Sequence, residues 1–141
     1  MSVGEVCTRT VMTAHPEETV ETAAARMAQY NVGALVVVEG QRPVGLVTDR
    51  DMVLRVVATG TNPQTCPLRT VMTSPPMTVP ETAALEDAVS HMRTCEVRRL
   101  VVVNEAHEVV GIFALDDMLD LLGEEQHTIA ALVHAAQGRW A

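Results

Sequence analysis

Two segments of the chain carry apolar residues at the i, i+3, i+4, i+7 spacing that places them on one face of a helix. In the first segment these residues are Val20, Ala23, Ala24 and Met27, and in the second they are Leu85, Ala88, Val89 and Met92. Thr19 and Thr82 precede the two segments, and a threonine hydroxyl can accept a hydrogen bond from the first turn of a helix. The pattern therefore predicts two amphipathic helices, each with a threonine N-cap.

Short runs of β-branched residues follow each predicted helix. Residues 34–38 and 43–47 form one pair of runs, and residues 100–103 and 109–113 form the other. Because turn-forming or charged residues separate the runs of each pair, we predict two hairpins. The runs are almost wholly apolar, which indicates strands covered on both faces.

Three further helices are predicted. Residues 49–58 precede Gly60, residues 115–122 precede Gly123, and residues 124–137 have apolar residues at helical spacing. Glycine is a common residue at the end of a helix. The last segment is expected to be an amphipathic helix whose apolar face packs on the body or on a partner chain.

The chain contains an internal duplication. Val-Met-Thr at 11–13 recurs at 71–73, residues 32–38 recur at 97–103, and residues 45–52 recur at 111–118, with offsets of 60, 65 and 66. The order of the matches is kept, as expected for a repeat. On this alignment the first copy is about five residues shorter, and it lacks the strand predicted at 77–80 in the second.

Each copy alone is too small to cover its own sheet and helices, so we expect the two to pack through their sheets. The predicted fold is α/β (α+β): two β-α-β-β-α repeats in a pseudo-two-fold disc with two equivalent clefts, plus a C-terminal helix. The expected boundaries are 1–62 for the first repeat, 63–123 for the second, and 124–141 for the C-terminal helix and tail.

Composition excludes several classes of protein. The 141 residues are 48% hydrophobic, which excludes a disordered chain, and the net charge of −8 argues against nucleic-acid binding. All ten basic residues are arginine, which excludes a P-loop and Schiff-base chemistry. No apolar run is long enough to span a membrane, and the first residues carry no export signal. Three scattered cysteines and five scattered histidines predict a cytoplasmic protein without a metal site.

Thr48 and Asp51 begin the helix predicted at 49–58 and are the strongest candidates for binding chemistry. A carboxylate suits the two hydroxyl donors of a ribose, and a hydroxyl at the start of a helix suits a phosphate. The same Thr-x-x-Asp spacing is also close to a capping box, in which both side chains serve only the helix. Spacing alone leaves both interpretations open.

The duplicated pattern resembles the tandem CBS-domain pair, or Bateman module. Its marks here are Val-Met-Thr, the amphipathic helix, Gly-Ala-Leu-Val-Val-Val, and Gly-x-x-Thr-x-x-Asp leading a helix, together covering residues 3–122. The resemblance implies a stand-alone, non-catalytic regulatory module that binds adenosyl ligands in the clefts and pairs into a dimer. It implies that Asp51 holds the ribose and that Thr48 reaches the phosphate.

In the family, each cleft takes its second wall from the other repeat. For the site on Asp51, this wall would comprise Thr73, Met77, Val79, Val97, Arg98 and Arg99. The two arginines would clamp phosphate, although they could also be solvated charges at the end of a strand. The second, weaker site would comprise Asp117, Thr13, Val32 and Ala34. There, Ala114 replaces Thr48, Gly33 and Ala34 replace the arginines, and the short strand is missing, so we expect one competent site per chain.

The predicted function is sensing of an adenine nucleotide of the AMP, ADP or ATP type, with no other cofactor. The alternative is a dimerising protein-interaction module with degenerate nucleotide sites. An enzyme is not expected, because no histidine, cysteine or serine accompanies the Asp-rich segments in a nucleophile–base arrangement. The expected partners are a second copy of the chain and an unidentified protein, not nucleic acid or a membrane.

Overall fold

A computed structural model of the chain describes residues 1–116 and residue 119. The elements in chain order are α1 (Val3–Val6), β1 (Thr13–Ala14), α2 (Val20–Tyr30), β2 (Ala34–Glu39), β3 (Arg42–Thr48), α3 (Asp49–Met52), a π-helical turn (Val53–Val57), a 3-10 turn (Leu68–Thr70), β4 (Thr78–Pro80), α4 (Leu85–Cys95), β5 (Arg99–Val103) and β6 (Val109–Ala114). Asp117, most of the helix predicted at 115–122, and the helix and tail predicted at 124–141 lie outside the described residues.

The strands form two sheets of the same design. Their orders are β1-β2-β3 and β4-β5-β6. In each sheet the first strand runs parallel to the second, and the second and third form an antiparallel hairpin. The two predicted hairpins and the α/β class are confirmed.

The N-cap prediction is correct for one helix and wrong for the other. The Thr19 hydroxyl accepts a hydrogen bond from the backbone N–H of Thr22 at 3.2 Å, at the start of α2. By contrast, α4 begins at Leu85 after Ala84, which has no side-chain acceptor, and Thr82 does not cap it. Thr19 and Ala84 are the corresponding positions, and Thr82 lies two residues too early to reach the first turn.

The structure also corrects the alignment of the two copies at their leading ends. Thr8 pairs with Ile112 of β6, and Thr73 pairs in the same way with Leu46 of β3. Thr8 and Thr73 are 65 residues apart, which is the offset of the matched segments that follow them. The Val-Met-Thr match at an offset of 60 is therefore a coincidence of sequence.

Consequently, the first copy is not shorter, and the prediction that it lacks the short strand is wrong. Thr13 of β1 lies opposite Val36 of β2, and Thr78 of β4 lies opposite Val101 of β5. These positions again differ by 65 residues. A strand of two residues is too short to give a recognisable alternation, which explains why the sequence pattern did not reveal it.

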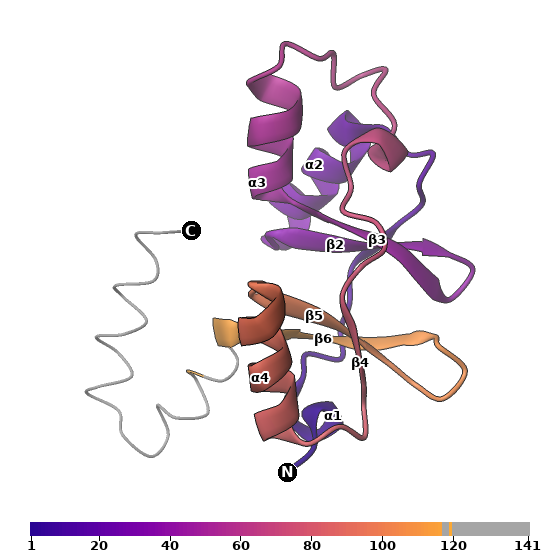
Figure 1. Ribbon diagram of the computed structural model, residues 1–141. Helices are drawn as coiled ribbons and strands as arrows, with labels where there is room; N and C mark the ends of the chain where they lie inside the picture. The colour runs from indigo at the N-terminus through magenta and orange to yellow at the C-terminus, as the bar shows by residue number, and fades with distance from the viewer. Residues whose placement is uncertain (117–118, 120–141) are drawn as a thin grey trace.

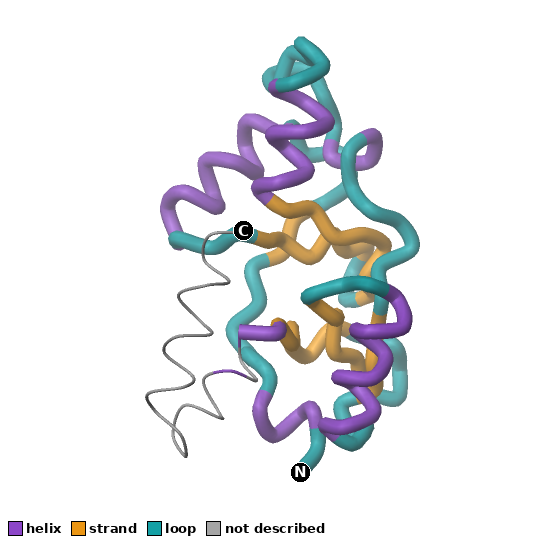
Figure 2. The backbone as a smooth tube through the Cα atoms, turned by 60° about the vertical axis from the view of Figure 1, so that its left-hand side comes forward, coloured by secondary structure: helices purple, strands orange, loops and turns teal. Residues whose placement is uncertain are grey.

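Alternation along the central strands divides the interior into three clusters. Leu35 and Val37 of β2 pack with α2 in the core of the first half, while Leu100 and Val102 of β5 pack with α4 in the core of the second. The opposite faces of the strands, including Val36 and Val101, meet in a third cluster between the sheets. Figure 2 shows the strands of both halves side by side in the interior, with most of the helices towards the outside. The predicted packing through the sheets is confirmed.

Each half also receives the segment that leads into the other half. Figure 1 shows α1 beside α4, and Val3 is wholly buried in the core of the second half. Conversely, residues 66–71 pack on the first half, with Leu68 wholly buried in its core. The backbone N–H of Leu68 donates to the carbonyl of Glu18, and that of Val3 donates to the carbonyl of Ala83, both at 2.9 Å.

The loop before α2 is held by a two-point ion pair between Glu18 and Arg26. Arg26 Nη2 lies 2.5 Å from Glu18 Oε1, and Arg26 Nη1 donates to Glu18 Oε2 at 3.0 Å and to the Thr13 carbonyl at 2.9 Å. The hydrogen bonds from Arg26 lower the pKa of Glu18. Burial opposes that change, and the backbone N–H of His15 adds to it. The pair therefore fixes β1 relative to α2.

We predict that Glu18→Gln lowers the free energy of unfolding by about 1 kcal/mol at pH 7. Because the folded-state pKa of Glu18 lies below its ordinary value of 4.5, the pair stabilises the protein fully above that value. The stabilisation is lost as the pH falls through the lowered pKa. Urea unfolding from pH 7 to pH 3 should show the variant and the wild type converging at low pH. Glu21→Gln, at an exposed position of α2, is the control, and a gap that stays constant with pH would contradict the assignment.

Candidate functional site

Thr48 and Asp51 form a reciprocal capping box at the start of α3. The Asp51 N–H donates to Thr48 Oγ1 at 3.1 Å, and the Thr48 N–H donates to Asp51 Oδ2 at 2.9 Å. Both residues are only partly buried, and the Asp51 side chain is 17% exposed. The capping arrangement considered from the sequence is thus present. It occupies Oδ2 of Asp51 and leaves Oδ1 without a hydrogen bond to any described residue.

The helix predicted at 49–58 is present, but its hydrogen bonding changes partway along. After α3, the N–H of Ala58 donates to the carbonyl of Val53 at 2.9 Å, an i to i+5 bond. A π-helical turn of this kind is frequent at functional sites. The turn carries Arg55, whose Nε lies 3.9 Å from Asp51 Oδ1.

Arg99 of the second half lies near the start of α3 in the first half. A Cβ atom added to Gly33 would lie 3.3 Å from Asp49 Oδ2 and 3.5 Å from Arg99 Nη2. The Gly33 carbonyl also accepts a hydrogen bond from the Asp49 N–H at 3.0 Å. The absence of a side chain at Gly33 therefore leaves room for a guanidinium from one half beside the helix start of the other.

The two predicted phosphate-binding arginines have no partner among the described residues. Arg98 is exposed and Arg99 is partly buried at the first position of β5. Four other arginines of the described residues differ in this respect, because each forms an ion pair with a carboxylate: Arg9, Arg26, Arg55 and Arg69. Two adjacent guanidinium groups without such a partner suit an anionic ligand.

Two of the other predicted wall residues lie on the segment that joins the halves. Thr73 is exposed, and its backbone exchanges two hydrogen bonds with Leu46 of β3, at 2.9 and 3.0 Å. Met77 is 40% exposed immediately before β4. Both side chains are accessible, as a binding role would require.

Val79 and Val97, in contrast, belong to the core of the second half. Val79 is only 5% exposed there, and Val97 packs against the same cluster. Because strand residues alternate, the neighbouring Thr78 directs its side chain to the opposite face, and it pairs with Val101. Thr78 lies within the strand at 77–79 that was expected to wall the site, but it was not singled out from the sequence. The constant offset of 65, which carries Thr13 to Thr78, is the signal that could have found it.

Three of the four residues predicted for the weaker site lie in the first half, where they correspond to Thr78, Val97 and Arg99 of the second half. Thr13 is exposed in β1, and Val32 and Ala34 are partly buried near the start of β2. Ala114 ends β6 where Thr48 ends β3, because Ala34 pairs with Thr48 and Arg99 pairs with Ala114. The fourth residue, Asp117, is not described.

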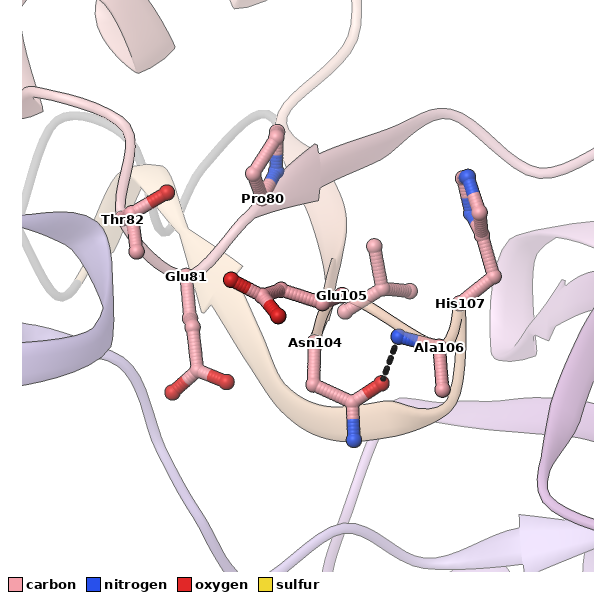
Figure 3. Close-up of a pocket in the computed structure, with 8 residues that line it drawn as sticks. Pro80, Glu81, Thr82, Asn104, Glu105, Ala106 and His107 are labelled. Atoms are coloured by element: carbon pink, nitrogen blue, oxygen red, sulfur yellow. Dashed lines mark hydrogen bonds between the residues drawn. The ribbon is translucent and has the colours of Figure 1, made fainter.

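A shallow depression of about 560 Å³ lies at the other end of the second sheet, away from the predicted site residues. It is lined by Pro80, Glu81, Thr82, Val103, Asn104, Glu105, Ala106 and His107. Figure 3 shows Asn104 folded back on the hairpin, where its Oδ1 accepts from the Ala106 N–H at 3.0 Å. This hydrogen bond shapes the turn itself.

The described residues lack two further kinds of feature. They contain no cluster of three or more histidine, cysteine, aspartate or glutamate side chains suited to a metal ion. Within the same part of the chain, no helix has the length and apolar character needed to cross a bilayer.

The duplicated fold is that of a CBS-domain pair. The CBS domain family model matches the chain twice, over residues 3–58 and 68–124. The chain therefore belongs to the CBS domain family, and the resemblance derived from its motifs is confirmed.

Three members of known sequence or structure are similar to this chain over most of its length. CBS domain-containing protein YhcV of Bacillus subtilis is 40% identical over 117 residues, or 83% of this chain and 82% of YhcV. Uncharacterized protein MK0525 of Methanopyrus kandleri is 37% identical over 86% of this chain, which spans only 62% of MK0525. The solved structure of CBS domain protein PAE2072 from Pyrobaculum aerophilum, complexed with AMP, is 30% identical with a TM-score of 0.76, covering 83% of this chain and 89% of that one.

We predict that Thr48→Ala lowers the free energy of unfolding by about 1 kcal/mol in the absence of any nucleotide. The physical reason is that the substitution removes the acceptor for the Asp51 N–H. Thr48→Ser keeps the hydroxyl and should retain most of the stability. Urea unfolding of the three proteins checks this, and equal stability of Thr48→Ala and the wild type would show that the capping box contributes nothing.

Proposed function

We propose that this CBS pair is a regulatory module that binds an adenine nucleotide of the AMP, ADP or ATP type at Thr48 and Asp51. The observation that carries the proposal is the position of Arg99, which comes from the other half, forms no ion pair with any described residue, and lies near the helix start formed by these two residues. A carboxylate with one oxygen that accepts no hydrogen bond from the described residues, a hydroxyl and a guanidinium then lie in one region. These are the groups needed for a ribose and a phosphate.

Each group has a distinct role in this proposal. Oδ1 of Asp51 accepts hydrogen bonds from the ribose hydroxyls, while Oδ2 remains bound to the Thr48 N–H. The Thr48 hydroxyl and the guanidinium groups of Arg98 and Arg99 donate to the phosphate. Thr73, Met77 and Thr78 contribute to the adenine side of the site. The AMP complex of PAE2072 supports an adenosyl ligand in general.

The two copies are not equivalent, and we propose one competent site per chain. In the second copy Ala114 offers no hydroxyl where Thr48 offers one, and Gly33 and Ala34 stand at the places of Arg98 and Arg99. The short strand no longer distinguishes the copies, since β1 is present. The remaining differences all remove groups that would bind phosphate.

Regulation would follow from the location of the site between the halves. A ligand that contacts both halves favours the arrangement in which those contacts are best, and it shifts the equilibrium by its difference in affinity. We propose that this change is transmitted to a second copy of the chain or to another protein in the cytoplasm.

Titration with AMP, ADP, ATP, NAD and S-adenosylmethionine tests the proposal. We expect one nucleotide per chain by calorimetry, and at a hundredfold excess over Kd about 2.7 kcal/mol of added stability. Asp51→Asn should abolish binding because it removes the charge, while its amide oxygen can still accept the Thr48 N–H. Asp87→Asn, at an exposed position of α4, is the matched control.

The Arg99→Met variant tests the phosphate contact separately. It should weaken binding of AMP by roughly tenfold, since hydrogen bonds to charged groups are the stronger ones, and it should leave binding of adenosine unchanged because adenosine has no phosphate. Two nucleotides per chain, or an equal effect on AMP and adenosine, would contradict the assignment.

A second candidate function, dimerisation and protein binding with degenerate nucleotide sites, is favoured by one observation. Val53, Leu54 and Val57 are 56%, 50% and 72% exposed on the same helical segment. An apolar group of this kind is typical of an interaction site.

If this surface joins two copies, Val57→Glu should convert a dimer to a monomer, because it places a charge in an apolar contact. Sedimentation velocity measures the change. Ala25→Glu, at an exposed position of α2, should leave the assembly unaltered. The same oligomeric state for wild type and Val57→Glu would exclude this surface as the dimer contact.

A further inference from the structure

The Arg55 side chain lies between the candidate ribose-binding carboxylate and the segment that joins the two halves. Its Nε lies 3.9 Å from Asp51 Oδ1, and its Nη1 donates to the Val71 carbonyl at 2.8 Å and approaches the Met72 carbonyl at 3.4 Å. One guanidinium thus contacts a charged group on one side and two backbone carbonyls on the other.

The segment that Arg55 holds leads directly to the opposite wall of the candidate site. Val71 is buried in the core of the first half, and Met72 packs beside it. The next residue is Thr73, whose backbone exchanges two hydrogen bonds with Leu46. A shift of the Val71 and Met72 carbonyls would therefore move the start of that wall.

The shape of the side chain matters as much as its charge. A guanidinium is planar and presents N–H groups in several fixed directions, so it can face a carboxylate and a carbonyl at once. A lysine ammonium at the same place would keep the positive charge, but it is a single point and could not span both contacts. The Arg55 side chain is 49% exposed and that of Asp51 is 17% exposed, so solvent weakens the charge interaction.

The sequence does not repeat this arginine in the second copy. The offset of 66 that relates Thr48 to Ala114 and Asp51 to Asp117 carries Arg55 to Leu121. A leucine has no donor for a carboxylate or a carbonyl. The arginine therefore belongs only to the copy that also keeps the threonine hydroxyl.

We propose that Arg55 is a positioning residue that links the Asp51 carboxylate to the segment before Thr73, so that a nucleotide on Asp51 and the order of that segment stabilise each other. This inference rests on the proposed nucleotide site. By linkage, if an ordered segment favours the ligand, the ligand must favour the ordered segment to the same extent.

The test compares Arg55→Met, Arg55→Lys and the matched control Arg50→Met. Arg50 lies in the same helix, is exposed, and its side chain has no partner among the described residues. Two quantities are measured on the full chain: the Kd for AMP by calorimetry, well below the unfolding temperature, and hydrogen exchange at the backbone N–H groups of Thr73 and Leu46 with and without AMP.

We expect Arg55→Met to raise the Kd for AMP by roughly fivefold, a value limited by the exposure of the pair. Arg55→Lys should fall between it and the wild type, and Arg50→Met should bind as the wild type does. AMP should slow exchange at Thr73 in the wild type and have much less effect in Arg55→Met. An arginine that only stabilises the fold would lower the unfolding temperature without changing the Kd or this protection, and that result would overturn the inference.

Failure of the nucleotide site itself would be recognised separately. If the wild type binds no adenosyl ligand, the proposed function is wrong. Hydrogen exchange measured without AMP then still tests whether Arg55 orders the segment before Thr73. Faster exchange at Thr73 in Arg55→Met than in Arg50→Met would support a link between Arg55 and the segment, and equal rates would overturn it.

Discussion

Neither sheet can cover both of its faces with residues of its own half. The central strands β2 and β5 are apolar on both sides, and Val36 and Val101 are wholly buried between the sheets. Each half also needs the leading segment of the other, since Val3 completes the second core and Leu68 completes the first. Because burial of apolar surface drives folding, the two halves form one cooperative unit in which the joining segments are structural parts of the core.

The regular elements follow from the sequence because each has a local cause. Helical spacing defined α2 and α4, and paired β-branched runs defined both hairpins. The alignment of the leading ends of the two copies could not be predicted from the sequence, because backbone hydrogen bonds across the sheet set their register. Thr8 and Thr73 form the same pairing with Ile112 and Leu46, although residues 6–8 read Val-Cys-Thr and so repeat only two of the three residues of the Val-Met-Thr motif. A constant offset between matched segments therefore indicated the equivalent positions of the two copies better than the identity of three residues did.

The candidate site was only partly predictable for a related reason. Thr48 and Asp51 are three residues apart, so their geometry is local, and the capping box anticipated from that spacing is present. Val79 and Thr78 differ by one position, and only the strand register decides which of them faces the core. Arg55 gave no signal at all, because its contact with the Val71 carbonyl spans sixteen residues and depends on how the segment between them folds back.

Capping and ligand binding are compatible uses of the same pair of residues. The capping box fixes Asp51 by one oxygen and Thr48 by its hydroxyl before any ligand arrives, so less conformational entropy is lost on binding. Oδ1 of Asp51 stays available, and Arg55 Nε at 3.9 Å is too distant to occupy it with a hydrogen bond. Ala114 of the second copy has no hydroxyl, so the side chain there can neither accept a helix N–H nor donate to a phosphate. Ala114, together with Gly33 and Ala34 at the places of Arg98 and Arg99, therefore makes two copies with similar cores unequal in the polar groups that they present at these positions.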